Sequence, residues 1–227
     1  MVIFFLLTLL TTTAGATPSD AEVVARLHFI EEHLDAQTPR AQAWFGTWTA
    51  IYGGLAIGQG AALLALHDRK SRVSYAIGGI GALLGTLSMT VIPMPAAFAA
   101  WSLHALPEST SDERRRKLAA AEHWLDRAAD GEQFEQSWLV QLGGVVVSTG
   151  IGLILELGYR YFAAALENTF IGIAIAQTQV TTSPMQAVRD RVAYAKRFAL
   201  PEPNPTPPLL RFKFAAYPGG LSIMGSF

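Results

Sequence analysis

The sequence predicts an all-α integral membrane protein: a four-transmembrane-helix bundle with an amphipathic helix, an extramembrane helical insertion and a short C-terminal β-hairpin. Two observations carry this prediction. The chain of 227 residues is 51% hydrophobic and only 15% charged, whereas soluble domains contain about a quarter charged residues. Five long runs also contain no Asp, Glu, Lys or Arg, at residues 1–19, 41–66, 73–103, 136–155 and 168–188. Such a division is typical of a chain shared between lipid and water.

The composition excludes several classes of protein. The chain has no cysteine, which excludes disulfides, Cys-ligated zinc, iron–sulfur clusters and thiol catalysis. The net charge is −1, so no global field attracts nucleic acid, and we expect no nucleic-acid partner.

Residues 1–16 have the features of a signal peptide. The run MVIFFLLTLL is too short to cross a ~30 Å hydrocarbon core as a helix, and Ala14-Gly15-Ala16 matches a signal-peptidase site. No Lys or Arg precedes the apolar run, so the alternatives are an uncleaved anchor or a misassigned start codon. The leader and the anchor both place residue 20 on the outer side of the membrane.

Residues 19–38 are predicted to form an amphipathic helix. Ser19 or Asp20 is the expected N-cap, and apolar residues follow at spacings of three and four. These are Val23, Val24, Leu27, Ile30 and Leu34. We expect this helix to stop before Pro39 and to lie on the membrane surface or against a neighbouring helix end.

Residues 41–106 are predicted to form the first transmembrane hairpin. Its spans, 41–66 and 73–92, are long enough at ~1.5 Å per residue to cross the core, and the charged loop between them fits a tight connection. Pro93 breaks the helix after the second span. Residues 96–106 are then expected to form an interfacial helical turn or the kinked end of that span.

Residues 107–135 are predicted to form an extramembrane helix. Ser109 or Ser111 is the expected N-cap, and the helix is expected to end near Gly131. The run Arg114-Arg115-Arg116-Lys117 has two interpretations. It is a solvated helix face with i,i+4 ion pairs, or it contacts phospholipid headgroups or an acidic partner.

Residues 136–198 are predicted to form a second transmembrane hairpin with an aqueous extension. The spans are 136–155 and 159–180, and helical periodicity continues past Pro184 to about Phe198.

The last part of the chain has two different patterns. Residues 199–208 include five prolines within eight residues, which predicts an extended polyproline linker. In residues 209–227, apolar and polar residues alternate on either side of Pro218-Gly219-Gly220, which predicts a β-hairpin. An isolated hairpin is marginal in water, so we expect it to dock on another surface.

The predicted threading places the N-terminus, residues 107–135 and the tail outside, and both short loops in the cytoplasm of a bacterial inner membrane. The raw count of basic residues opposes this orientation, but the loop 67–72 holds three of them in six positions. The predicted aromatic belts agree with the threading. One belt contains Trp44, Trp48, Trp101 and Trp138, and the other Tyr75, Tyr159 and Tyr161.

Small residues four apart within the spans predict faces for close helix packing. The candidates are Gly54 with Gly58, Gly81 with Gly85, and Ser148 with Gly152.

Five polar residues are candidates for positions inside the membrane: Gln59, Gln141, Glu156, Arg160 and Glu167. The two glutamines are expected to form interhelical hydrogen bonds. Glu156 and Arg160 are four apart and are expected to form an interfacial salt bridge, with a transport or proton site as the alternative. A continuous helix would bring Glu167 to nearly the same face as Glu156, whereas a tight turn around Gly158 would place Glu156 and Arg160 in headgroup water.

No catalytic, cofactor or metal site is predicted. All five histidines lie outside the spans, and the run HFIEEH around His28 and His33 is not an HExxH motif. We therefore expect a non-enzymatic structural or partner-binding component of the cell envelope, with the C-terminal hairpin and residues 109–130 as contact surfaces. The alternative is a small transporter or channel that works as a homo-oligomer.

Overall fold

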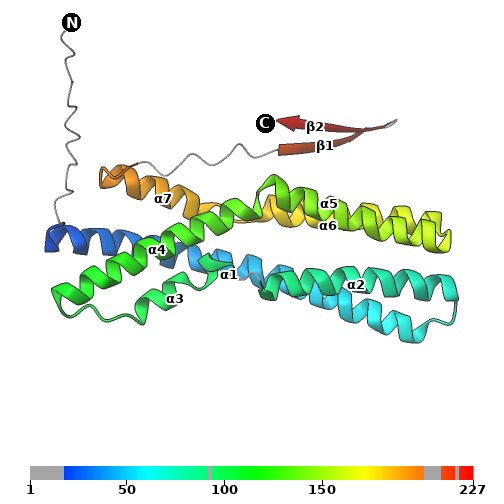
Figure 1. The fold of residues 1–227 in the computed structure, drawn as a ribbon, viewed down its shortest axis with the longest axis horizontal. Coiled ribbons are helices and arrows are strands. Elements are labelled where there is room, and N and C mark those ends of the chain that lie inside the picture. The colour runs from blue at the N-terminus through cyan, green and yellow to red at the C-terminus, as the bar shows by residue number, and fades with distance from the viewer. Residues whose placement is uncertain (1–17, 92–93, 202–210, 218–219, 227) are drawn as a thin grey trace, which may run out of the picture.

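The computed structural model describes residues 18–91, 94–201, 211–217 and 220–226. Figure 1 shows an elongated molecule in which helices from distant parts of the chain meet at one end, and two helical hairpins form the other. We call the first part the head, which comprises residues 19–40, 94–135 and 184–200. The second part, the stem, comprises residues 41–91 and 136–183.

One long helix, α1 (Asp20–Ala65), belongs to both parts. The predicted N-cap at Ser19 is confirmed, since its side chain accepts a hydrogen bond of 3.2 Å from a backbone N–H of the first turn. The predicted end before Pro39 is wrong, because the helix continues through this residue. Proline removes one backbone N–H. Here Leu34 before it and Trp44 after it are both buried against other elements, so packing on both sides holds the helix together.

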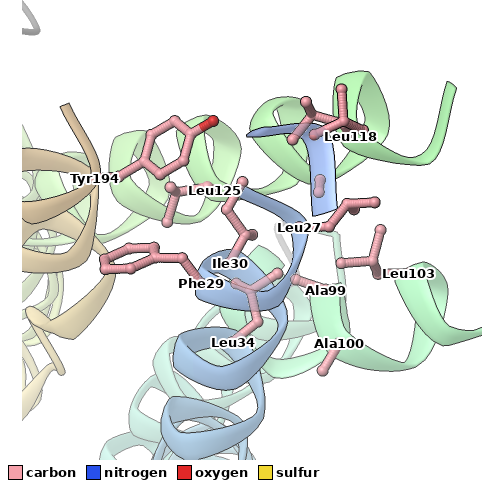
Figure 2. Packing of buried hydrophobic residues seen from close by; sticks show 12 residues of the cluster. Leu27, Phe29, Ile30, Leu34, Ala99, Ala100, Leu103, Leu118, Leu125 and Tyr194 are labelled. Atoms are coloured by element: carbon pink, nitrogen blue, oxygen red, sulfur yellow. The ribbon is translucent and has the colours of Figure 1, made fainter. Parts of the chain in front are cut away.

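The head contains the first part of α1, the 3₁₀ turn η1 (Pro95–Ala97), α3 (Ala99–His104), α4 (Ser111–Glu135) and α7 (Gln186–Arg197). Apolar side chains of α1, α3, α4 and α7 meet in one core, part of which is shown in Figure 2. The core includes Val23, Leu27, Phe29, Ile30, Leu34, Ala99, Ala100, Leu103, Leu118, Ala121, Leu125 and Tyr194. The apolar side chains of η1 belong to a second cluster, with Trp44 and Trp48 of α1. Residues 96–106, predicted as an interfacial turn or the end of a span, therefore belong to the head.

Helix α4 begins and ends at residues other than those predicted. Its N-cap is Thr110, between the two predicted serines, and Thr110 forms a capping box with Glu113. The helix passes through Gly131 and ends at Glu135. A Cβ atom at Gly131 would lie 2.9 Å from Cδ of Pro95, so this glycine admits η1 against the helix and does not terminate it.

The basic run of α4 divides between the interior and the surface of the head. Lys117 is buried, and its Nζ lies 2.6 Å from Glu31 Oε1 and 2.7 Å from Glu108 Oε2. Arg114 pairs with Asp20 of α1, whereas Arg115 and Arg116 are exposed. The predicted solvated face with i,i+4 pairs is therefore wrong for half of the run, because the pairs join different elements.

A second charged group, Glu132, is buried beneath the start of α7. Its side chain is 1% exposed, and Oε2 accepts a hydrogen bond of 3.2 Å from the backbone N–H of Val188. Burial raises the pKa of Glu132 from 4.5 to about 7. The backbone N–H groups at the start of α7, that of Val188 among them, act in the opposite direction but do not outweigh burial.

The stem consists of two antiparallel hairpins. Residues 41–65 of α1 pair with α2 (Arg69–Val91), and α5 (Trp138–Leu153), continued by the π-helical turn η2 (Ile154–Gly158), pairs with α6 (Phe162–Thr182). Both connecting turns lie at the end of the stem that is remote from the head (Figure 1). They also approach each other, since Nζ of Lys70 lies 5.4 Å from the ring centre of Tyr161.

Two of the described helices are long and apolar enough to cross a membrane: α2 and the continuous segment Trp138–Gly158. The other two stem segments do not pass this test of composition, because α1 contains Gln59 and α6 contains Glu167 and Asn168. Membrane association is thus weakly supported. The predicted bundle of four spans is not confirmed.

The tail contains two strands, β1 (Arg211–Tyr217) and β2 (Gly220–Ser226), which pair antiparallel with Phe214 opposite Ile223. The docking of this hairpin stays a prediction. The predicted signal peptide at 1–16 and most of the predicted linker at 199–208 lie outside the described residues.

Candidate functional site

A cavity of about 430 Å³ lies between the two hairpins of the stem, and we call it the inter-hairpin cavity. All four stem helices line it, and the last turn of α4 closes its head end. Most lining residues are apolar or glycine. The polar ones are Tyr52, Gln59, Ser88, Glu135, Ser148, Asn168 and Gln179. Polar side chains in a mostly apolar cavity are candidates for function, because they can orient a bound ligand.

At the head end, hydrogen bonds join the two hairpins. Tyr52 Oη donates to Gln179 Oε1 at 2.6 Å, and Gln179 Nε2 donates to Met89 Sδ at 3.3 Å. Trp44 and Trp48 both donate through Nε1 to Thr182 Oγ1, at 3.2 and 3.3 Å. The bonds from α1 to α6 hold the hairpins together where they meet the head.

These contacts correct the predicted aromatic belt. Trp44 and Trp48 are each 7% exposed, so they pack inside the junction of head and stem and do not line a membrane interface. Trp101 and Trp138 are exposed, as a belt requires.

Towards the remote end, amide side chains meet around Gly78. Asn168 Nδ2 donates to Ser74 Oγ at 3.2 Å and to Ala164 O at 2.9 Å. A Cβ atom at Gly78 would clash with Gln59 Oε1 and lie 3.1 Å from Asn168 Oδ1. Gln59 makes no hydrogen bond to any described residue, so its amide is free to bind a ligand or water.

Glu135 is the only residue of the lining that is Asp, Glu, Lys, Arg or His. It ends α4, just before α5 begins, and its carboxyl has no hydrogen bond or ion pair with the described part of the chain. Burial alone raises its pKa above the ordinary value, because no donor or cation compensates for lost water. This carboxyl therefore lacks a positively charged or donor partner.

Of the predicted intramembrane polar residues, only Gln59 lines the cavity. Gln141 is buried, and its Nε2 donates at 3.1 Å to the backbone oxygen of Gln136, the C-cap residue of α4. The hydrogen bond of Gln141 thus joins α5 to the end of α4 and not to another helix of the stem.

The remaining three predicted residues lie outside the cavity. The predicted salt bridge between Glu156 and Arg160 is absent, and Glu156 Oε2 is buried without a partner among the described residues. Arg160 has a positive φ of 59°, which ends the helical path of η2. The chain therefore turns near Gly158, one of the two predicted alternatives. Glu167 is exposed on α6.

The predicted packing residues separate into two groups. A Cβ atom at Gly54 or Gly58 would meet nothing within 4 Å, so the predicted close packing there is wrong. The other predicted packing positions do contact neighbours, across one hairpin or between the two. A Cβ at Gly85 would clash with Tyr52, one at Gly81 would lie 2.7 Å from Ile151 Cδ1, and one at Gly152 would clash with Thr169, whereas Ser148 is buried with its Oγ 2.6 Å from a Cβ at Gly172.

Sequence reasoning missed Asn168, Gln179 and Glu135. The first two are eleven residues apart, which places them on one face of a helix and could have identified the polar side of α6. No sequence pattern identifies Glu135, because it reaches the cavity only through the angle at which α4 meets α5.

No protein-family model matches the chain, and no curated protein or solved structure is significantly similar to it.

Proposed function

We propose that the protein is a four-span membrane protein whose stem crosses the bilayer and whose head lies at one membrane face. The observation that carries this proposal is the outward direction of apolar side chains in the stem. Ile57 is 76% exposed, Leu64 86% and Leu157 78%. Ile57 and Leu64 share one face of α1, and Leu157 lies in η2 of the other hairpin. Such exposure on both hairpins is costly in water and favourable in lipid.

The path of the chain supports four spans. Helix α2 begins at the end of the stem remote from the head, so the chain reaches that end only through residues 41–65 of α1. In the same way α6 returns the chain from the second turn to α7 in the head. If α2 and α5 cross the bilayer, their antiparallel partners therefore cross it too.

The exposed Glu167 is compatible with a spanning α6. It lies five residues after the helix begins at Phe162, about 8 Å along the axis. A carboxyl at this depth is within reach of the headgroups, where its charge is tolerated.

Sided cysteine labelling tests the span number, because the natural chain has no cysteine. We expect His67→Cys and Tyr159→Cys, at the two turns, to react with a membrane-impermeant maleimide from one side of sealed vesicles. Arg116→Cys, on the exposed surface of α4, should react only from the other side. Labelling of all three from one side, or of the two turns from opposite sides, would contradict four spans.

Within this architecture we place the protein among structural or partner-binding components of the cell envelope. Support comes from the head surface, where Arg115 and Arg116 are exposed without an ion pair to the described residues and Trp101 is 77% exposed. Aromatic and arginine side chains are enriched at protein interfaces.

Cross-linking in whole cells tests this role. A chain ending at Leu200 should lose a cross-linked partner if the tail binds it, and the double variant Arg115→Ser, Arg116→Ser should lose it if α4 does. Arg160→Ser, at the opposite end of the stem, is the matched control. An unchanged cross-linked species in both test variants would contradict partner binding through these surfaces.

A second function, that of a small oligomeric transporter or channel, is favoured by the inter-hairpin cavity. Gly143 lines this cavity and Gly150 does not, although a Cβ atom meets nothing within 4 Å at either position. In planar bilayers, Gly143→Leu should reduce ion conductance and Gly150→Leu should not. Conductance no greater than that of protein-free bilayers would contradict a channel.

A further inference from the structure

The lining of the inter-hairpin cavity contains an acidic residue but no basic one. Twenty-five residues line it, and Glu135 is the only one among them that is Asp, Glu, Lys, Arg or His. An anionic ligand would therefore find a negative charge and no compensating cation. A cationic ligand would find a carboxylate at the head end and no opposing charge.

The carboxyl of Glu135 has no partner within the described residues. Its burial is penalised because water is removed and nothing replaces it. By contrast, the charged Lys117 in the head has two carboxylate partners. A bound cation would give Glu135 an oppositely charged partner, as the fold gives one to Lys117. In surroundings of low dielectric constant such a pair attracts strongly.

The remaining walls favour a ligand with large apolar groups. Leu55, Val140, Val147, Ile151 and Ile175 line the cavity. So do Tyr52, which bonds to Gln179 at the head end, and Phe134, which precedes Glu135 in the last turn of α4. Aromatic faces attract organic cations as well as apolar groups. The polar side chains elsewhere on the walls are neutral amides and hydroxyls.

From this arrangement we propose that the inter-hairpin cavity binds a lipophilic organic cation, with the Glu135 carboxylate as its counter-ion and the rings of Tyr52 and Phe134 beside the charge. The proposal deepens the second proposed function, because it names the class of substrate that a transporter with this cavity would accept. It concerns binding and does not require a particular number of spans.

Binding of tetraphenylphosphonium to the purified full chain in mild detergent tests the proposal. We expect saturable binding with one site per chain, measured by isothermal titration calorimetry. Triphenylphosphine oxide, which is neutral and of similar shape, should bind at least ten-fold more weakly. Partition of either probe into detergent alone is measured in parallel with protein-free micelles.

Two pairs of variants separate charge from shape. Glu135→Gln should weaken tetraphenylphosphonium binding at least ten-fold, whereas Glu167→Gln, at an exposed carboxyl outside the cavity, should leave it unchanged. Gly143→Leu should weaken binding of both probes, and Gly150→Leu should not. Each variant is first checked for an unchanged circular dichroism spectrum and elution volume.

Three outcomes would overturn the proposal: no saturable binding to the full chain, equal affinity for the charged and neutral probes, or equal losses in Glu135→Gln and Glu167→Gln. None of them bears on the sided labelling of His67→Cys, Tyr159→Cys and Arg116→Cys. Failure of the cation site and failure of the four-span architecture are thus distinguishable.

Discussion

The head and the stem contain apolar side chains in opposite arrangements. In the head, Ile30, Leu34, Leu103 and Leu125 are at most 1% exposed and surround one core. In the stem, large aliphatic side chains point outward, and the space between the hairpins holds a cavity with amides, hydroxyls and one carboxyl. The head has a buried apolar core like that of a water-soluble domain, whereas the exposed apolar side chains of the stem are those expected of the membrane-spanning part proposed above.

The two parts also differ in where their polar side chains find hydrogen-bond and ion-pair partners. Most charges of the head lie at its surface or pair across helices, as Arg114 does with Asp20 and Arg191 with Asp130. The buried Glu132 instead accepts a backbone hydrogen bond from α7. The stem has few charges, and its polar groups turn inward to neighbouring helices, as Tyr52 does to Gln179 and Asn168 to Ser74.

The largest expected effect is a contrast between two isoleucines. Ile30→Ala removes buried side-chain volume from the head core and should lower the free energy of unfolding by about 2–5 kcal/mol. Ile57→Ala, at an exposed position of the stem, should change it by less than about 0.5 kcal/mol. Urea titration of the purified protein in mild detergent measures both. Equal losses would mean that the outer surface of the stem is packed against protein, which contradicts the comparison.

The pH dependence of head stability should depend on Glu132. Its pKa is raised from 4.5 to about 7 in the folded chain, so the folded state retains a proton that the unfolded chain releases. This contribution to stability is fully present below pH 4.5 and is lost as pH rises to about 7. The loss over this window is on the order of 3 kcal/mol.

Urea titrations between pH 4.5 and 8 test this prediction. Glu132→Gln cannot ionise and should flatten the slope across the window, whereas Glu32→Gln, at an exposed carboxyl, should leave the slope as in the natural chain. A slope that Glu132→Gln does not alter would assign the pH dependence to other buried groups such as Asp190, whose pKa burial also raises.

The smallest expected effect lies within the stem. Gly152→Leu would force a side chain against Thr169 and within 3.0 Å of the backbone oxygen of Ala165. This should separate α5 from α6 and cost about 1–3 kcal/mol. Gly150→Leu, on the same helix with open space beside it, is the matched control. Equal melting temperatures for the two variants in detergent would show that the hairpin is loosely packed.

The positions of most helices could be predicted from the sequence, but several of their ends could not. Charge-free runs and apolar periodicity predicted helices where α2, α5, α6 and α7 lie. Local signals misplaced the boundaries at Pro39 and Gly131, because tertiary contacts outweigh the local preference of a single residue. At Pro39 the contacts hold a helix together, and at Gly131 they use the missing Cβ for close approach of Pro95.

The candidate site was only partly predictable for a related reason. Gln59 is visible as a polar residue within an apolar run, but the same argument selected Gln141, which bonds to Gln136 at the end of α4 and does not line the cavity. Which face of a helix a side chain occupies follows from periodicity. Which neighbour that face meets depends on how the two hairpins are placed.

The sequence by itself determined the division of the chain into charged and uncharged segments and the turns between them, because hydration of charge and the length of a helix are local properties. Only the tertiary structure decided that residues 19–40, 94–135 and 184–200 form one head, that Lys117 and Glu132 are buried in it, and that Glu135 faces the inter-hairpin cavity. These features depend on the packing of helices far apart in the chain, and no local pattern of residues encodes that packing.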